Sequence, residues 1–377
     1  MRVATYNAGL AVGVLPHAAE RAAPVVQALA ALPADLICVQ EVWLESHWRE
    51  LADAAAPRLL HALRPPAARQ SITRCTDMEA RPVLRCVQRH CGATSEAGLA
   101  PCAVRHCGHL VTSLSSGCTE CLTRDPLRSL AKVTTECAPA GLHLPAARAR
   151  GGATYVYGGS YGIGLLTSLD VVEEDFLRFE SEQLARGVLY ARLRPKSATT
   201  DLHVFCTHLT ADSRSVAYPA RAGSWKSEHA RQVRELRVWI GQKAGTTAPV
   251  LLIGDLNTGP ALAATRVGAR VPEQYASFAE LGFFNPYLDG PNAARCSFCS
   301  ANTLNGGRGP GGSLIDHILV RGPLRALGIE RVLDDPLELL VGGERLSSHL
   351  SDHFGLAATV SFTPAARAPS PRATGSL

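Results

Sequence analysis

The sequence predicts an α/β fold, because apolar strands that read as buried on both faces alternate with helical stretches. The clearest strand lies in residues 248–260, where four consecutive aliphatic residues follow a proline and end at Gly254. A second apolar run, residues 35–41, follows an alanine-rich helical stretch over residues 16–32. With 377 residues, of which 46% are hydrophobic and 19% charged, the chain can bury a large core. We therefore expect one enzyme-sized domain with an insertion.

The remaining regular elements follow in chain order. An alternating strand is expected over residues 2–7, and an amphipathic helix over residues 224–243 returns the chain to the strand of Val250. A short helix is expected over residues 275–281. Further regular structure, mostly strands, is predicted at residues 154–157, 161–167, 187–193, 202–208, 314–320 and 356–362. The Ala/Pro/Arg/Ser-rich tail, residues 364–377, is predicted to be disordered.

Composition excludes a membrane-spanning protein, since no run approaches the roughly 18 apolar residues that a span needs. The N-terminus enters a strand pattern at once, so we expect no export signal within this chain. The net charge of +5 is mild and carries little weight.

The cysteines separate into two kinds. Cys38 and Cys206 lie in apolar strands and are interpreted as small, unpaired core residues. The other ten are crowded and are predicted to be structural: Cys75, Cys86, Cys91, Cys102, Cys107, Cys118, Cys121, Cys137, Cys296 and Cys299. Such even-numbered clustering favours disulfides, and hence an extracellular or exported protein.

Zinc is the alternative for the cysteine cluster. The two C-x-x-C pairs, Cys118 with Cys121 and Cys296 with Cys299, can supply four thiolates, with His90, His106 and His109 as spare ligands. A zinc site would be compatible with a cytoplasmic location.

The segment around most of these cysteines, residues 64–150, shows neither strand nor helix periodicity and is taken as the insertion. It holds twelve Arg or Lys against six Asp or Glu, which indicates a solvated shell or a surface that faces an anionic partner.

Polar side chains recur where apolar strands end, and this recurrence predicts a functional site. Any one of them alone is commonly a helix cap or a satisfied core group. Asp255 and Asn257 are two residues apart, so on an extended backbone they point the same way. The full set is Asn7, Glu41, His208, Asp255, Asn257, Asp316, Asp352 and His353.

The chemistry of this set indicates phosphoester hydrolysis. Oxygen-rich ligands fit a hard divalent cation such as Mg²⁺, with Mn²⁺ as a second choice, better than they fit Zn²⁺. A cation held by carboxylates suits phosphate substrates. A histidine oriented by an aspartate provides the base that activates water.

The ordered motifs resemble those of the endonuclease/exonuclease/phosphatase superfamily, related to pancreatic deoxyribonuclease. They are Tyr6-Asn7, Gln40-Glu41-Val42-Trp43, Thr207-His208-Leu209, Gly254-Asp255-Leu256-Asn257, Ile315-Asp316-His317-Ile318 and Ser351-Asp352-His353. The resemblance implies a four-layer α/β sandwich built on two mixed β-sheets. It also implies one catalytic domain over residues 1–363, interrupted by the Cys-rich insertion at about residues 64–150.

The same resemblance implies roles for the site residues. Glu41 would be the principal Mg²⁺ ligand, helped by Asn7 and Asp352. His353, paired with Asp316, would activate water. The remaining three would act on the phosphate: Asp255 and Asn257 by orienting it and the water, and His208 by stabilising the pentavalent phosphate or its leaving group.

Within the superfamily, the sequence most resembles neutral sphingomyelinases. The residues that carry this likeness are 40–43, 186–192, 207–211 and 228–236. It implies a phospholipid substrate at a membrane surface, release of phosphocholine from sphingomyelin, and no obligate protein partner. The alternative is a non-specific endonuclease or deoxyribonuclease that acts on nucleic acid with the same chemistry. For a choline head group, the clustered Tyr155, Tyr157 and Tyr161 are candidate contacts, with core packing as the other interpretation.

Overall fold

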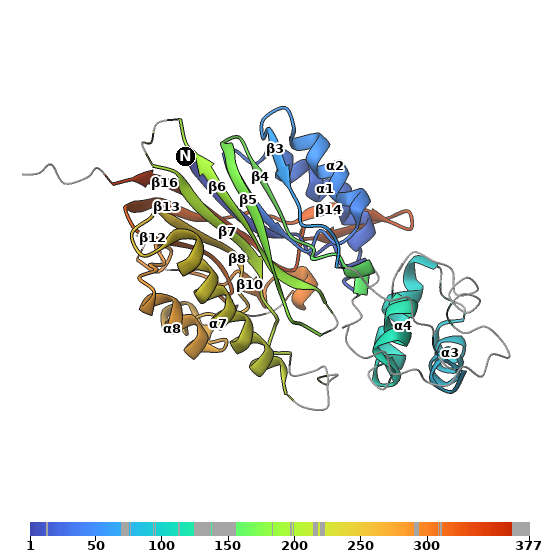
Figure 1. Cartoon of the computed structure of the whole chain (residues 1–377). Coiled ribbons are helices and arrows are strands. Elements are labelled where there is room, and N and C mark those ends of the chain that lie inside the picture. The colour runs from blue at the N-terminus through green and yellow to red at the C-terminus, as the bar shows by residue number, and fades with distance from the viewer. Residues whose placement is uncertain are drawn as a thin grey trace, which may run out of the picture.

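Two β-sheets pack face to face, and helices cover both outer faces, so the protein has four layers (Figure 1). The computed structural model describes residues 1–363 apart from residues 13, 69–74, 76, 93, 95, 112–113, 124–136, 138–155, 183, 197, 199, 214–217, 219–222, 290–293, 308 and 310. The tail that was predicted to be disordered, residues 364–377, lies outside the described residues. The predicted α/β class and the four-layer sandwich are confirmed.

The first sheet has six strands in the order β13-β16-β1-β2-β4-β3. Only β1 and β2 run parallel, and the other neighbours are antiparallel, so the sheet is mixed. The strands are β1 (Arg2–Asn7), β2 (Leu36–Gln40), β3 (His61–Leu63), β4 (Gly164–Thr167), β13 (Leu324–Val332) and β16 (Gly355–Phe362).

The second sheet has five strands in the order β12-β8-β7-β6-β5 and is also mixed, with β7 and β8 as its parallel pair. The strands are β5 (Asp170–Phe179), β6 (Arg186–Arg194), β7 (Leu202–His208), β8 (Val250–Asp255) and β12 (Asp316–Arg321). Small accessory strands are β9 (Val267–Gly268), β10 (Phe298–Cys299), β11 (Gly312–Ser313), β14 (Leu337–Val341) and β15 (Glu344–Ser348).

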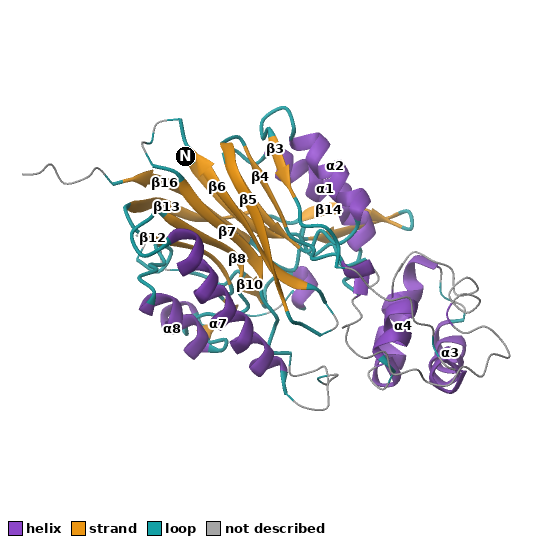
Figure 2. Ribbon diagram, viewed as in Figure 1, coloured by secondary structure: helices purple, strands orange, loops and turns teal. Residues whose placement is uncertain are grey.

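Three apolar layers hold the sandwich together. Between the sheets, side chains such as Leu36, Leu165 and Leu251 are fully buried. Helices α1 (Ala18–Ala31) and α2 (Glu45–Ala55) cover the outer face of the first sheet. Helices α7 (Trp225–Ala244) and α8 (Pro272–Glu280) cover the second sheet, and these purple helices are seen on either side of the strands in Figure 2. Short 3₁₀ turns are η1 (Val156–Gly159), η2 (Ala263–Thr265) and η3 (Thr303–Asn305).

The strand ends of both sheets meet at one edge. Because β1 and β2 run parallel, Asn7 lies beside Gln40 in register, just before Glu41. In the second sheet, His208 of β7 pairs with Asp255 of β8, and Asp255 also pairs with Asp316 at the start of antiparallel β12. The topology therefore brings together at one point polar groups that lie far apart in the sequence.

The insertion forms a small helical unit beside the sandwich (Figure 1). Helices α3 (Asp77–Cys91) and α4 (Glu96–Val111) make a hairpin, joined by disulfides Cys86–Cys107 and Cys91–Cys102. Helix α5 (Ser116–Thr123) follows, and disulfides Cys75–Cys118 and Cys121–Cys137 secure it. These bridges replace the core that so short a unit cannot build by itself.

Every cysteine is paired, which corrects one expectation and favours disulfides over zinc. Cys38 and Cys206, interpreted from sequence as unpaired core residues, form a disulfide that joins β2 of the first sheet to β7 of the second. Cys118 and Cys121 bond to different partners, whereas Cys296 bonds to Cys299, so the proposed four-thiolate zinc site is not formed. Cys38 and Cys206 are 168 residues apart and meet only because the two sheets pack together, so the local sequence does not reveal this disulfide.

Other differences have simple causes. Residues 154–157 were predicted to be regular structure, mostly strand; Thr154 and Tyr155 lie outside the described residues, and Val156 and Tyr157 belong to the 3₁₀ turn η1. Strand β5 was missed because three consecutive acidic residues, Glu173, Glu174 and Asp175, interrupt its alternation of apolar and polar side chains. No helix among the described residues is long and apolar enough to cross a membrane.

Candidate active site

A cavity of about 600 Å³ opens at the edge where the strand ends meet. Five of the eight predicted site residues line it directly: Glu41, His208, Asp255, Asn257 and His353. Asn7, Asp316 and Asp352 lie behind these and are buried. Lining residues that sequence reasoning did not assign include Arg186, Arg270, Asp212, Trp225 and Phe298.

His353 and Asp316 form a buried dyad. The Nδ1 of His353 lies 2.8 Å from Oδ2 of Asp316, which is fully buried at the start of β12. Burial alone would lower the pKa of His353, but Asp316 and the neighbouring carboxylates raise it well above its ordinary value. Burial raises the pKa of Asp316, while His353 and the Ser297 hydroxyl act in the opposite direction. Because Nδ1 is held by the carboxylate, Nε2 is the nitrogen that faces reacting groups.

Asp255 is the centre of the site. Its Oδ2 accepts a hydrogen bond from Asn7 Nδ2 at 3.0 Å and lies 3.2 Å from His208 Nε2. The same oxygen is 3.9 Å from His353 Nε2. Burial would raise the pKa of Asp255, but His208, His353 and a backbone donor hold it below its usual range, so the carboxyl group is ionised.

Two polar residues at the cavity have a left-handed backbone. Glu41 has φ 56° directly after β2, and Asn257 has φ 48° two residues after β8. The main-chain N–H of Asn257 donates to Asp255 Oδ1 at 2.9 Å, and its side-chain Nδ2 donates to Leu209 O at 2.9 Å. The strand ends at Asp255, so the expectation of an extended backbone through Asn257 was wrong, although both side chains do line the cavity. Such conformations cost about 1–3 kcal/mol for ordinary residues and concentrate at functional sites.

Glu41, Asp352 and Asn7 form an oxygen-rich group suited to a hard cation. Asn7 Nδ2 lies 3.4 Å from Glu41 Oε1. The pKa of Asp352 is raised, first by burial and also by the like charge of Glu41. A divalent cation between these carboxylates would relieve that repulsion, so the residues fit Mg²⁺.

A second group of candidate ligands lies beside the first. Asp255, Asp316 and His353 each offer one ligand atom, and these atoms lie within 4.8 Å of one another. Here His353 Nδ1 already donates to Asp316, so this group is better described as the base and its orienting carboxylates.

Arg186 is the functional residue that sequence reasoning missed most clearly. It begins β6, is only 6% exposed, lines the cavity, and its Nη1 has no hydrogen-bond partner among the described residues. Its guanidinium lies 5.8 Å from the Trp43 ring centroid. Burial lowers the pKa of Arg186, and the charges of Glu41, Asp255 and Glu228 act in the opposite direction. Nη1 still has no hydrogen-bond partner in the described part of the chain, so it is free to contact an anionic ligand. The signal available in the sequence was an arginine at the start of a predicted strand.

Tyr157 and Tyr161, two of the three tyrosines considered for a choline head group, do not line this cavity. Tyr157 stacks on Trp43 with ring centroids 5.2 Å apart and donates its hydroxyl to Val12 O at 3.0 Å. Tyr161 is 4% exposed and packs edge-on against Phe176. Both occupy the apolar interior, which is the core interpretation, and Tyr155 lies outside the described residues. Tyr157 and Tyr161 thus have packing partners, and a choline contact by either stays a prediction.

The sequence profile of the Endonuclease/Exonuclease/phosphatase family matches residues 4–353. The chain belongs to this family. The match runs from β1 to the histidine of the dyad, so it spans every residue of the site described above. No curated protein sequence matches the chain.

Solved structures of the family share this fold at low sequence identity. Sphingomyelinase C from Streptomyces griseocarneus is 17% identical, with TM-score 0.54, covering 95% of this chain and 98% of that one. A beta toxin variant from Staphylococcus aureus with bound magnesium ions is 11% identical, with TM-score 0.54 and coverages of 96% and 99%. A mannosyl-6-phosphatase from Bacteroides thetaiotaomicron is 14% identical, with TM-score 0.53 and coverages of 96% and 100%. The names of these neighbours differ in substrate, so the shared fold does not decide the substrate.

Proposed function

We propose that the protein is a Mg²⁺-dependent phosphodiesterase that hydrolyses sphingomyelin or a related choline phospholipid and releases phosphocholine. The observation that carries the hydrolytic part is the position of His353 between Asp316 and Asp255. The choice of lipid is supported by the sphingomyelinase-like sequence segments and by the sphingomyelinase C neighbour.

His353 is the base in this proposal. Its Nδ1–H donates to Asp316, so in the neutral imidazole the lone pair of Nε2 faces the cavity, and a cation at the neighbouring carboxylates would offset part of the charge that raises the pKa of His353. The 3.9 Å between Nε2 and Asp255 Oδ2 is too long for a direct hydrogen bond, and a water molecule can contact both atoms. Asp255 would orient this water, and His353 would take its proton as the oxygen attacks phosphorus. The bond from phosphorus to the ceramide oxygen would break at the same time, and that leaving oxygen would take a proton from water.

Arg186 and His208 would stabilise the charge that develops on the phosphoryl group. Arg186 contributes an unpaired guanidinium nitrogen at the cavity wall, and His208 stands beside Asp255 at 3.2 Å. Donors that are already oriented in a buried site stabilise a transition state more than they would in water. Asn257 lies on the same wall and would help to orient the phosphate.

Glu41 and Asp352, with Asn7 beside them, would hold Mg²⁺. When bound there, the cation would supply Lewis-acid polarisation of a phosphoryl oxygen. The hard oxygen donors of this group are the basis for choosing Mg²⁺, and Mn²⁺ is the natural substitute because it accepts the same ligands.

The compartment follows from the cysteines. Six disulfides, including one buried between the sheets, indicate an oxidising environment. We propose that the protein is exported and meets lipid at the outer surface of a membrane.

A nucleic-acid substrate is the second candidate, and one observation favours it. The α3–α4 hairpin exposes Arg85, Arg89 and Arg105, together with the stacked rings of His90 and His106. Such a positive surface can contact a phosphate backbone. Under this alternative, replacing the three arginines by Glu would weaken DNA cleavage, and cleavage would fall steeply with salt.

The test compares both substrates with the same protein preparation. Purified oxidised protein is given sphingomyelin in detergent micelles or plasmid DNA, each with Mg²⁺, and EDTA provides the metal-free control. Phosphocholine release without DNA nicking is the expected result. Nicking without phosphocholine release would overturn the lipid assignment and support the nuclease. A His353→Ala variant controls for contaminating hydrolases in both assays.

A further inference from the structure

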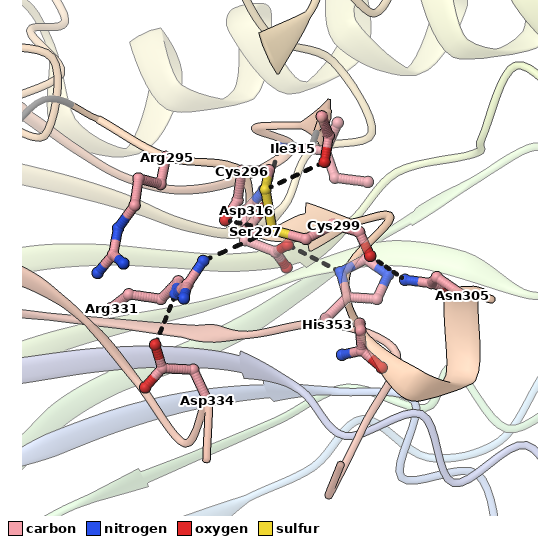
Figure 3. Close-up of a disulfide and its surroundings, with 12 residues drawn as sticks. Arg295, Cys296, Ser297, Cys299, Asn305, Ile315, Asp316, Arg331, Asp334 and His353 are labelled. Atoms are coloured by element: carbon pink, nitrogen blue, oxygen red, sulfur yellow. Dashed lines mark hydrogen bonds and ion pairs between the residues drawn. A yellow bond between two sulfur atoms is a disulfide. The ribbon is translucent and has the colours of Figure 1, made fainter. Parts of the chain in front are cut away.

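A four-residue loop closed by the Cys296–Cys299 disulfide lies against the catalytic dyad (Figure 3). The two residues inside the loop, Ser297 and Phe298, contact one member of the dyad each. The Ser297 Oγ accepts the main-chain N–H of Asp316 at 3.1 Å. The ring of Phe298 lies 5.1 Å from the ring of His353.

Ser297 is placed to orient the main chain at Asp316. Its side chain is fully buried, and its Oγ also accepts the N–H of Ile315 at 3.1 Å. With both N–H groups donating to this oxygen, the hydroxyl hydrogen remains free to donate. Among the described residues, Asp316 Oδ1 is buried without a hydrogen-bond partner, so Ser297 holds Asp316 through the main chain.

The loop is attached to the segment that carries His353. The main-chain N–H of Phe354 donates to Ser297 O at 2.8 Å. Asn305 Nδ2 donates to Cys299 O at 3.3 Å and to Asp352 O at 2.7 Å, so one side chain bridges the loop and the residue before His353. Figure 3 shows Arg331 reaching the sulfur of Cys299, at 3.6 Å, from the opposite side.

We propose that the Cys296–Cys299 disulfide and Ser297 are positioning elements of the hydrolysis, which hold Asp316 and His353 in the orientation that activates water. This inference rests on the proposed function, because it assigns the loop to the same dyad. The loop acts through the dyad and not on the substrate, so its loss lowers kcat and leaves KM nearly unchanged.

The size of the loop explains why the effect should be local. The two cysteines are only 3 residues apart, so the bridge restricts the unfolded chain least of the six disulfides. By contrast, Cys38–Cys206 closes a separation of 168 residues. Removing Cys296–Cys299 is therefore expected to alter the dyad before it alters the fold.

The experiment compares three variants with the intact protein at saturating Mg²⁺. Ser297→Ala and the double change Cys296→Ser/Cys299→Ser remove the proposed elements. Cys91→Ser/Cys102→Ser removes a disulfide of the insertion and is the matched control. We expect kcat to fall about 10- to 100-fold in the first two, as for partners that orient a catalytic group, with KM within about twofold and the control unchanged. An unchanged kcat in folded Ser297→Ala would overturn the proposal, whatever the folding of the cysteine variant.

A double-mutant cycle separates positioning from general structural support. If Ser297 acts through Asp316, adding Ser297→Ala to Asp316→Asn should lower kcat by less than about twofold further. A second full loss in that background would contradict the proposal.

One readout needs no substrate. The low-field proton resonance of the His353 Nδ1–H that bonds to Asp316 should be present in the intact protein and broadened or shifted in Ser297→Ala. An unchanged resonance overturns the positioning role. An intact protein that hydrolyses no phosphodiester, yet shows this resonance change, overturns the proposed function and leaves the positioning role supported.

Discussion

The Nδ1 of His353 lies 2.8 Å from Asp316 Oδ2, and this bond connects the start of β12 to the loop before β16. It fixes the tautomer of the imidazole and leaves Nε2 for water. Without it the ring would be free to rotate in its cavity. The dyad is therefore where substitutions should affect the reaction most.

Replacing the base should remove most of the activity. His353→Ala and Asp316→Asn are each expected to lower kcat by about 10²- to 10⁴-fold, the range for loss of general base catalysis. Initial rates at saturating Mg²⁺ measure this, with circular dichroism to verify folding. A folded variant of either kind with near-normal turnover would show that another group activates water.

The cation site predicts a different signature for Glu41. Glu41→Gln keeps the shape of the side chain and removes the charge, so the Mg²⁺ concentration for half-maximal rate should rise. Replacing a residue that only supports a metal ligand typically weakens metal binding roughly 10- to 100-fold. Glu41 would contact the cation directly, so its replacement should raise the required Mg²⁺ concentration by more than this. Titration of activity with Mg²⁺ checks it. An unchanged titration curve would place the metal elsewhere.

Arg186 should contribute to charge stabilisation, and the same strand offers a control. Arg186→Ala is expected to lower kcat by about 10²- to 10³-fold, the loss seen when one oriented donor to a developing anion is removed. Arg192 also lies on β6, but it pairs with Glu173 and Asp201 away from the cavity. Arg192→Ala should retain full activity. Equal losses in the two variants would indicate a stability effect rather than a contact with phosphate.

His317 predicts how stability depends on pH. This histidine is fully buried; its Nε2–H donates to Thr258 O at 2.8 Å, and its Nδ1 accepts from Asn285 at 3.1 Å. Burial lowers its pKa to about 4. The unfolded chain, with an ordinary pKa near 6.5, binds the proton first, so stability contributed by neutral His317 is present above about pH 6.5 and lost toward pH 4.

Denaturant unfolding at pH 7 and pH 5 tests this directly. The His317 contribution to the loss in unfolding free energy is about 2 kcal/mol over that interval. Glutamine does not titrate, so between pH 7 and pH 5 the unfolding free energy of a His317→Gln variant should fall by about 2 kcal/mol less than that of the original protein. The same pH dependence in both proteins would mean that His317 is not the group responsible.

The sequence predicted the site better than it predicted the interior. Apolar strands such as residues 250–255 have a local signature, and a polar residue at each strand exit can be recognised without a structure. Arg186 was not recognised as a site residue because its significance depends on being buried without a partner. Serine is common in exposed loops, so Ser297 does not stand out in the sequence. Its contact with the main chain at the start of β12 exists only in the folded protein.

Long-range pairings explain the remaining differences. The Cys38–Cys206 disulfide depends on how two sheets face each other, which no local pattern encodes. Tyr157 and Tyr161 cluster in sequence beside glycines, and that clustering does not distinguish a binding face from core packing. Their ring contacts with Trp43 and Phe176, which come from distant segments, appear only in the folded chain.

The most direct measurement is phosphocholine release from sphingomyelin micelles by the intact, oxidised protein, with and without Mg²⁺, beside the His353→Ala variant. The account predicts release that requires Mg²⁺, stops on addition of EDTA and is lost in the variant. Release that persists in EDTA or in His353→Ala would contradict the assignment of the metal or of the base. No release from sphingomyelin, with nicking of plasmid DNA by the same sample, would contradict the lipid substrate.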